Sequence, residues 1–303
     1  MNGYVVVGSA VVGLLVGLTG AGGGALMTPM LVLLFSVKAS TAISSDLVAA
    51  VAMRPFGAVV HLRRGNVNLA LVRWMAVGSV PAAFFGSWLL HLLDGGSSAS
   101  AVVQRALGAA LLLGAAAMLV RYVLDRRSAN ARAGTVAATA VRPATTVAIG
   151  ALGGLVVGLT SVGSGSLLIV LLMFAYPNLS ARSLVGTDLV QAVPLAAAAA
   201  LGALAFGHIE FPVTAAIIVG SVPAVLVGSL LSSRVDDRWL RPAIFCVVVA
   251  SGLKYAGFTP TEVVSVAAVV AVAAVADLGL TRRARRLNSS VQMTTLQAKV
   301  PSR

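Results

Sequence analysis

The chain has 303 residues, of which 58% are hydrophobic and only 10% are charged, and its mean hydropathy is +0.97. This composition is typical of integral membrane proteins and excludes an ordinary soluble domain. The formal net charge of +13 does not indicate a nucleic-acid-binding protein, because the chain has no basic module with interleaved aromatic residues.

Apolar segments follow one another along the chain. They span 4–19, 24–36, 42–60, 69–92, 102–122, 145–160, 165–177, 183–206, 212–231, 239–256 and 260–280. Their lengths are those of helices, not of the roughly ten-residue alternating strands of a membrane barrel. Since only helices and closed barrels satisfy every backbone group in hydrocarbon, the sequence predicts an all-α polytopic membrane protein.

Two pairs of segments are unusually short. The first and second, and likewise the sixth and seventh, fall below the roughly 20 residues of a full crossing. Each pair is therefore expected to form a re-entrant hairpin or a broken pair of helices.

An internal repeat relates the two halves of the chain. The segment from Gly17 to Leu26 recurs from Gly158 to Leu167, an offset of 141 residues, and the offset then increases by one. The later matches are Asp46-Leu47-Val48 with Asp188-Leu189-Val190, Gly65 with Gly207, and 77–81 with 219–223. Duplicated apolar segments broken by Gly and small polar residues indicate a secondary transporter whose site lies between two halves.

The basic residues orient these segments. With the linker and the C-terminal tail in the cytoplasm, alternation places the Gly65 loop inside and the equivalent Gly207 loop, which carries no Lys or Arg, outside. Because these equivalent loops lie on opposite sides of the membrane, the two halves must be inverted relative to each other. Inversion requires an odd number of segments in each half, here five. We therefore expect an inverted-topology repeat bundle in the cell (inner or plasma) membrane, with a cytoplasmic C-terminus.

The predicted organisation has five parts. They are a first transmembrane repeat (1–122), a polar cytoplasmic linker (123–144), a second, inverted repeat (145–256), an additional C-terminal transmembrane helix (257–281) and a basic cytoplasmic tail (282–303). The basic residues of the linker and tail, Arg121 among them, are interpreted as topology signals and contacts with anionic lipid head groups. No cofactor or metal is predicted, and the lone Cys246 excludes disulfides within the chain.

The Gly-rich interruptions are the first candidate site. A run of Gly disfavours helix by roughly 1 kcal/mol per residue, and unwound backbone at membrane depth is tolerated only where it faces protein or a cavity. The free N–H groups and the dipole of the following helix would attract an anion. Close helix packing is the alternative. The predicted substrate-binding residues are Thr19, Gly20, Gly22, Gly23 and Gly24 in the first break and Thr160, Ser161, Gly163, Ser164, Gly165 and Ser166 in the second.

Asp46 and Asp188 are repeat-equivalent carboxylates inside apolar runs. Ionisable groups within the membrane are functional candidates by default. Because burial favours the neutral form of a carboxyl group, we expect either residue to be able to take up and release a proton as a coupling group. The alternative is that each Asp caps a helix near the interface.

Arg54 is a basic residue near the middle of an apolar run, about two helical turns after Asp46. It is expected to pair with Asp46 in one state and with an anionic substrate in another; the alternative is snorkelling toward the cytoplasmic end. Gln191, one turn after Asp188, joins the predicted substrate-binding set. His61 and His208, in or beside loops, are more typical of interface residues than of a proton relay.

These residues resemble the TauE/SafE family of membrane permeases, also called sulfite exporters. The matching features are Gly20-Ala21-Gly22-Gly23-Gly24 followed by Pro29, Gly186-Thr187-Asp188-Leu189, Arg54 where family members often carry a basic residue, and His61. The second break departs from this pattern, with Gly163-Ser164-Gly165 and no Pro at the position matching Pro29. The resemblance implies transport of a small sulfur-containing anion such as sulfite or a sulfonate, without saying which.

The resulting hypothesis is a secondary transporter, specifically an exporter, of such an anion by alternating access. One alternative is an H⁺- or Na⁺-coupled permease for another small metabolite, with Asp46 and Asp188 as the coupling groups. A Ser164–His208 hydrolase is disfavoured because no nucleophile motif surrounds Ser164. The expected partners are a small anionic substrate and membrane lipids, a homodimer stays open, and nucleic acid is not expected.

Overall fold

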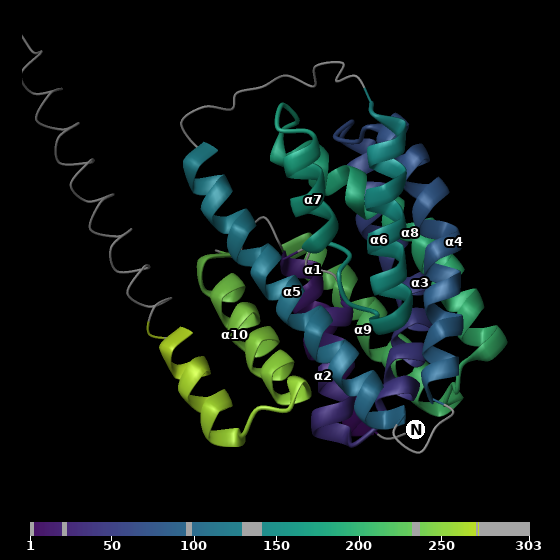
Figure 1. Cartoon of the computed structure of the whole chain (residues 1–303), viewed down its shortest axis with the longest axis vertical. Helices are drawn as coiled ribbons and strands as arrows, with labels where there is room; N and C mark the ends of the chain where they lie inside the picture. Colours follow the sequence, from purple (N-terminus) through teal and green to yellow (C-terminus); the bar gives the residue numbers. More distant parts are fainter. Residues whose placement is uncertain are drawn as a thin grey trace, which may run out of the picture.

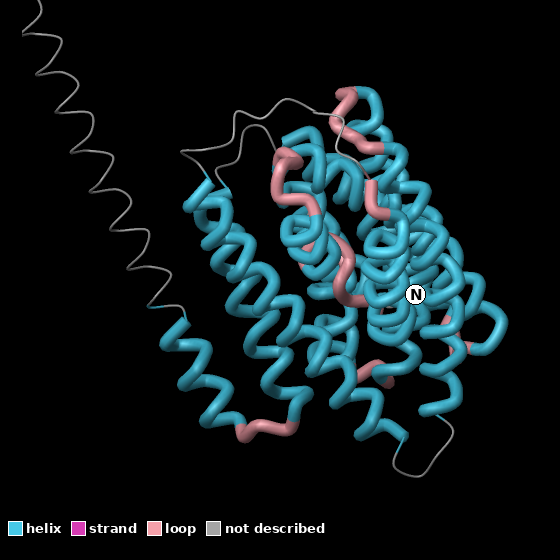
Figure 2. Tube along the Cα trace, turned by 45° about the horizontal axis from the view of Figure 1, so that its top comes forward, coloured by secondary structure: helices cyan, strands magenta, loops and turns pink. Residues whose placement is uncertain are grey.

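The computed structural model describes residues 3–19, 23–94, 99–128, 141–231, 237–270 and 272. Within these ranges every regular element is a helix, and short loops join the helices (Figure 2). Six of the described helices are long and apolar enough to cross a membrane. The chain is an all-α polytopic membrane protein, as its composition predicts.

Ten labelled helices form the bundle (Figure 1). They are α1 (Gly3–Thr19), α2 (Gly24–Phe35), α3 (Ala39–Arg63), α4 (Leu69–Asp94), α5 (Ala99–Ser128), α6 (Pro143–Thr160), α7 (Leu167–Ala175), α8 (Ala181–Phe206), α9 (Phe211–Leu231) and α10 (Asp237–Ala256). A shorter apolar helix, Pro260–Val270, follows α10.

The helix boundaries differ from the predicted segments in two places. Helix α5 continues to Ser128, into the range predicted as a polar linker, because Leu and Arg are good helix formers whether or not lipid surrounds them. Helix α7 has only nine residues, so it is too short to cross a bilayer. The described residues do not include 129–140 or the tail 282–303. Of the predicted last helix (257–281), they include 257–270 and 272.

Large apolar side chains lie on the outer surface of the bundle, and several polar side chains are buried within its apolar core. The side chains of Leu34, Phe211 and Leu230 are more than 70% exposed, whereas Asp46 and Gln191 are fully buried. In water this distribution would be unfavourable, but in lipid it lets polar groups find partners within the protein.

The two halves are interleaved. Helix α1 packs most extensively against α9, and α4 packs against α6. Since α6 is the repeat-equivalent of α1, and α9 that of α4, the first helix of each half packs against the fourth helix of the other. The equivalent helices α5 and α10 also contact each other. They run in opposite directions, and the equivalents α2 and α7 lie toward opposite ends of the bundle (Figure 1).

Glycine permits these two crossings. A Cβ atom built at Gly13 of α1 would lie 2.7 Å from the backbone oxygen of Ser221 in α9. At the repeat-equivalent crossing, a Cβ at Gly154 of α6 would lie 2.4 Å from the backbone oxygen of Ser79 in α4. Real Cβ atoms do not approach an oxygen so closely, so both helix pairs pack backbone against backbone, as small residues allow in membranes.

Substituting Gly154→Ala should therefore push α6 away from α4 and lower the stability of the folded protein by about 1–3 kcal/mol, as overpacking does. Thermal unfolding of the purified protein in detergent measures the effect. The matched control is Gly57→Ala in α3, where a Cβ would meet only the side chain of Leu189 at 3.7 Å. Equal stability of the two variants would contradict the backbone contact.

Candidate functional site

The two Gly-rich breaks contact each other. Helix α2 begins at Gly24, and a Cβ built there would lie 1.8 Å from the backbone oxygen of Ser161, directly after the end of α6. Only glycine fits at this contact. Gly24 therefore allows close packing, which was the alternative interpretation of the glycines. Its contact with Ser161 places the break of the first half against the break of the second. Gly20 and Gly22 lie outside the described residues.

The second break has a backbone conformation that glycine favours. Ser161 (φ 59°), Gly163 (φ 118°) and Gly165 (φ 96°) all have positive φ, which costs little for Gly and more for other residues. The N–H of Ser161 donates to the carbonyl oxygen of Val157 and so closes the C-terminus of α6. This conformation ends one helix and starts the next within a few residues.

Neither helix that follows a break has a side-chain cap. The N-cap residues are Gly23 for α2 and Ser166 for α7, and neither makes a capping hydrogen bond through a side chain. The first-turn N–H groups of a helix have no partner within the helix and carry its positive dipole end. Both helix starts thus keep the chemistry that was predicted to attract an anion.

Thr19 and Thr160 use their hydroxyl hydrogens within their own helices. Thr19 Oγ1 donates to Leu15 O at 2.7 Å, and the equivalent Thr160 Oγ1 donates to Val156 O at 2.6 Å. The role of these two hydroxyl groups in binding a substrate stays a prediction, and it would require them to turn away from these carbonyl oxygens. Ser164 is buried in the break, and its role as a substrate ligand stays a prediction.

Asp46 lies deep inside its helix and connects the two halves. Helix α3 begins at Ala39 and its N-cap is Lys38, so the alternative that Asp46 caps the helix is wrong. Its side chain is fully buried, and its Oδ2 accepts hydrogen bonds from Ser161 Oγ at 2.7 Å and from Thr28 Oγ1 at 3.1 Å. Its other oxygen, Oδ1, has no hydrogen-bond partner among the described residues.

Asp188 has a different environment, although it is the repeat-equivalent of Asp46. Ser180 is the N-cap of α8, so Asp188 does not cap its helix either, and it is likewise buried. The guanidinium charges of Arg54 and Arg121 both act on its carboxylate, which also lies beside the backbone N–H of Gly165. The charges of two arginines therefore act on Asp188, whereas two hydroxyl groups donate hydrogen bonds to Asp46.

The two arginines reach this place from different helices. Arg54 Nη1, from α3, donates to Ala192 O at 3.2 Å, one turn beyond Asp188 on α8. Arg121 Nη1, from α5, donates to Gly165 O at 3.4 Å in the second break. Arg54 therefore extends across to α8 and does not snorkel to the end of α3. Sequence analysis missed Arg121 as a site residue; its position at the end of an apolar run was the available signal.

Gln191 links the site to the α4–α6 crossing. Its Nε2 donates to Ser79 Oγ on α4, and the backbone oxygen of Ser79 is the atom packed against Gly154. The Gln191 Oε1 atom is buried and has no partner among the described residues. Gln191 thus lies one turn from Asp188 with an acceptor available, and its contact with a substrate stays a prediction.

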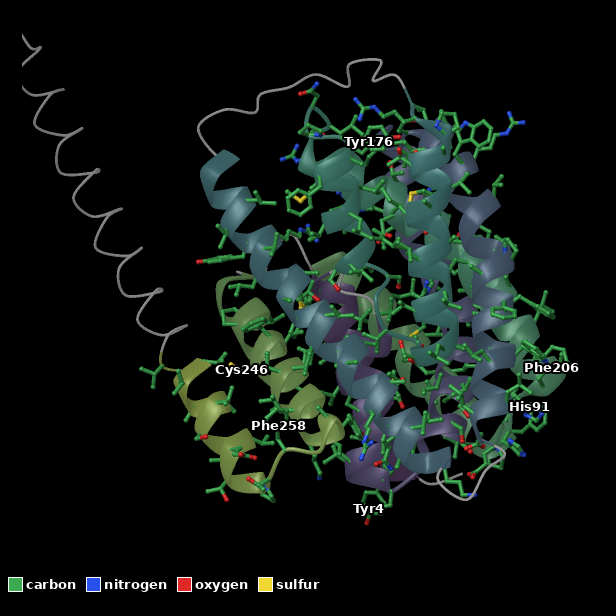
Figure 3. All side chains as sticks on the ribbon, viewed as in Figure 1. Tyr4, His91, Tyr176, Phe206, Cys246 and Phe258 are labelled. Carbon is green, nitrogen blue, oxygen red and sulfur yellow. The ribbon has the colours of Figure 1, made fainter. Side chains whose placement is uncertain are left out.

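The histidines lie away from the breaks. His208 is 68% exposed, and its Nδ1 is 3.5 Å from Asp94 Oδ2. His91 and Phe206 lie close together near the same edge of the bundle (Figure 3), with ring centroids 6.5 Å apart. His61 on α3 lies beside Gly186 of α8. In the described part of the chain, no three His, Cys, Asp or Glu side chains form a group that could hold a metal ion.

Comparison with known proteins identifies the class. The family described as Sulfite exporter TauE/SafE matches residues 5–255. The chain belongs to this family. The match includes α1 to nearly the end of α10 and stops before the helix Pro260–Val270.

Relatives in Bacillus subtilis (strain 168) agree with this family assignment. The chain is 38% identical to "Probable membrane transporter protein YjnA" over 244 residues, which is 80% of this chain and 95% of that protein. It is 26% identical to "Probable membrane transporter protein YdhB" over 241 residues, 80% of this chain and 94% of that protein. No solved structure matches the chain significantly. The TauE/SafE protein is a membrane transporter and not an enzyme.

The charge arrangement at Asp188 makes a prediction about stability. Substituting Arg54→Gln removes a guanidinium group that acts on both buried carboxylates, so the folded protein should lose on the order of 1–3 kcal/mol. Adding Asp188→Asn to Arg54→Gln should restore part of this loss, because the carboxylate that needs the cation is then neutral. Thermal unfolding of four proteins in detergent, namely the unaltered protein, the two single variants and the double variant, tests the coupling; additive effects would contradict it.

Proposed function

We propose that this TauE/SafE protein is a secondary transporter that exports a small anion, sulfite or an organosulfonate, by alternating access. The observation that carries the proposal is that Arg54 bonds to Ala192, one turn from Asp188, that Arg121 bonds to Gly165 in the second break, and that both guanidinium charges act on Asp188. Two guanidinium groups beside an uncapped helix start offer an oxyanion the donors that replace its hydration shell.

The choice of a sulfur oxyanion rests on geometry and on the family. A guanidinium group presents paired N–H donors that match the oxygens of a sulfite or sulfonate group. Both arginines act electrostatically on Asp188, so a bound anion and the carboxylate would share the same positive charges. The matched family is described as a sulfite exporter, which supports the proposed substrate and direction.

The interleaved halves support alternating access. The pairs α1–α9 and α4–α6 pack backbone against backbone and would each move as one body. The breaks meet at Gly24 and Ser161, where α2 and α6 come together. Rocking of one body against the other about this contact would expose the site to each side in turn.

The second candidate is an H⁺- or Na⁺-coupled permease for another small metabolite. The buried carboxylates of Asp46 and Asp188 favour a coupling role, because each has an oxygen without a hydrogen-bond partner among the described residues. We place the protein in the cell membrane with its C-terminus in the cytoplasm, since this orientation puts the arginine-rich linker and tail inside.

Transport by protein reconstituted in liposomes tests the function. Sulfite or sulfoacetate should move under a pH gradient, a Na⁺ gradient or a membrane potential, and Arg54→Gln and Arg121→Gln should each lower the rate at least tenfold, as loss of a charge-assisted hydrogen bond does. Arg105→Gln, an exposed position on the same helix as Arg121, should transport like the unaltered protein.

Two results would reject the leading proposal. If none of these anions is transported, the proposed substrate class is wrong. If Arg105→Gln lowers the transport rate as much as Arg54→Gln and Arg121→Gln do, the two arginines have no specific role in transport. If flux of another metabolite appears and depends on Asp46 and Asp188, the second candidate replaces the first.

Cysteine labelling in intact cells tests the orientation. In a Cys246→Ser background, His208→Cys should react with a membrane-impermeant maleimide, because the loop between α8 and α9 is placed outside. Arg64→Cys, in the exposed loop between α3 and α4, should react only after the cells are permeabilised. Labelling of both positions from the same side would contradict the inverted arrangement.

A further inference from the structure

We propose that Asp46 is the carboxylate of a Na⁺ site whose other ligands include the hydroxyl oxygens of Thr28 and Ser161. The proposal rests on the proposed transport function and names its coupling ion. It assigns different tasks to the two repeat-equivalent carboxylates: Asp188 faces the anion-binding arginines, and Asp46 binds the cation.

The ligand set has the chemistry of a hard monovalent cation. Asp46 Oδ2 lies 2.7 Å from Ser161 Oγ and 3.1 Å from Thr28 Oγ1, so oxygens from α3, α2 and the second break meet at one point. Hard cations prefer oxygen ligands. One carboxylate balances one positive charge, whereas a dedicated Ca²⁺ site gathers several carboxylates. The cluster therefore fits Na⁺ better than a divalent ion.

Asp46 keeps one buried carboxylate oxygen that can serve as a further ligand. Asp46 Oδ1 has no hydrogen-bond partner, and neither has the Oγ of the adjacent Ser45. Both side chains are fully buried. The two hydroxyl groups that now donate to Oδ2 can rotate their hydrogens away and turn their oxygens toward an ion.

No helix end neutralises the Asp46 charge. Ser161 is at the C-terminus of α6, which carries about half a negative charge, and Thr28 is one turn from the N-terminus of α2, which carries about half a positive charge. These two partial charges nearly cancel. A full carboxylate charge in a low-dielectric interior is costly, so Asp46 is stable there either when it is protonated or when a positive ion lies beside it. The C-terminal ends of broken helices are where transporters bind Na⁺.

Arg54 does not take that role, although its charge acts on Asp46. The two residues are eight positions apart on α3, a rise of about 12 Å along the helix axis. The guanidinium group of Arg54 donates to Ala192 on α8, beside Asp188. The groups that contact the Asp46 carboxylate directly are the hydroxyls of Thr28 and Ser161.

The second half lacks the same ligands. With the offset of 141 residues, the position equivalent to Thr28 is Ile169, and the position equivalent to Ser161 is Gly20. Neither offers a hydroxyl group. The repeat therefore builds a cation site once, at Asp46, and the ion would join α2 and α3 of the first half to the break of the second.

Thermal unfolding of the purified full chain in detergent tests the site. NaCl should raise the unfolding temperature in a saturable way relative to equal concentrations of KCl or choline chloride, because a ligand that binds only the folded state stabilises it. Asp46→Asn should abolish this difference, whereas the matched variant Asp188→Asn should keep it. Thr28→Val and Ser161→Ala, which retain the carboxylate, should each weaken Na⁺ binding about tenfold.

Three results would overturn the site: equal stabilisation by KCl or choline chloride, a Na⁺ effect that survives in Asp46→Asn, or stabilisation that follows pH alone. If Asp46→Asn does not fold, the Thr28→Val and Ser161→Ala affinities decide. The outcome is separable from the proposed function. If Na⁺ raises the unfolding temperature but no anion moves in liposomes, the Na⁺ site stands and the anion-transport proposal is rejected. If anions move without Na⁺ and Na⁺ does not raise the unfolding temperature, only the Na⁺ site is rejected.

Discussion

The close contact of helix backbones across the two halves is the constraint on which the rest of the structure depends. In lipid, helices gain little by burying apolar side chains, so tight packing must come from backbones that approach each other closely. Gly13 against Ser221 and Gly154 against Ser79 provide this approach at two repeat-equivalent crossings. Because each crossing joins a first helix to a fourth helix of the other half, neither half can form its packing alone.

The same interleaving brings the two breaks together. A chain whose halves folded side by side would keep each break within its own half, but here Gly24 of one break touches Ser161 of the other. Asp46 then reaches across the contact to Ser161. Polar groups that would be costly in hydrocarbon thus find their partners in the opposite half, which ties the position of the site to the packing of the whole bundle.

A symmetric frame supports asymmetric chemistry. The positions of Asp46 and Asp188 are equivalent, yet Arg54 corresponds to Ala196, and Thr28 corresponds to Ile169. As a result, one carboxylate accepts hydrogen bonds from two hydroxyl groups, and the charges of two guanidinium groups act on the other. Duplication supplies two similar sites, and a few substitutions between the halves give them different electrostatic environments.

The amino-acid sequence alone determined the fold class, the repeat and most helix positions, because composition, apolar length and internal similarity are local properties of the chain. It also singled out Asp46, Asp188 and Arg54, since a charged residue in an apolar run is visible without coordinates. It could not show that Arg121 meets Gly165, that Thr28 and Ser161 share Asp46, or that Thr19 and Thr160 bond within their own helices. Those contacts join residues 18 to 115 positions apart or depend on how a side chain turns, and the tertiary packing of interleaved helices alone decides them.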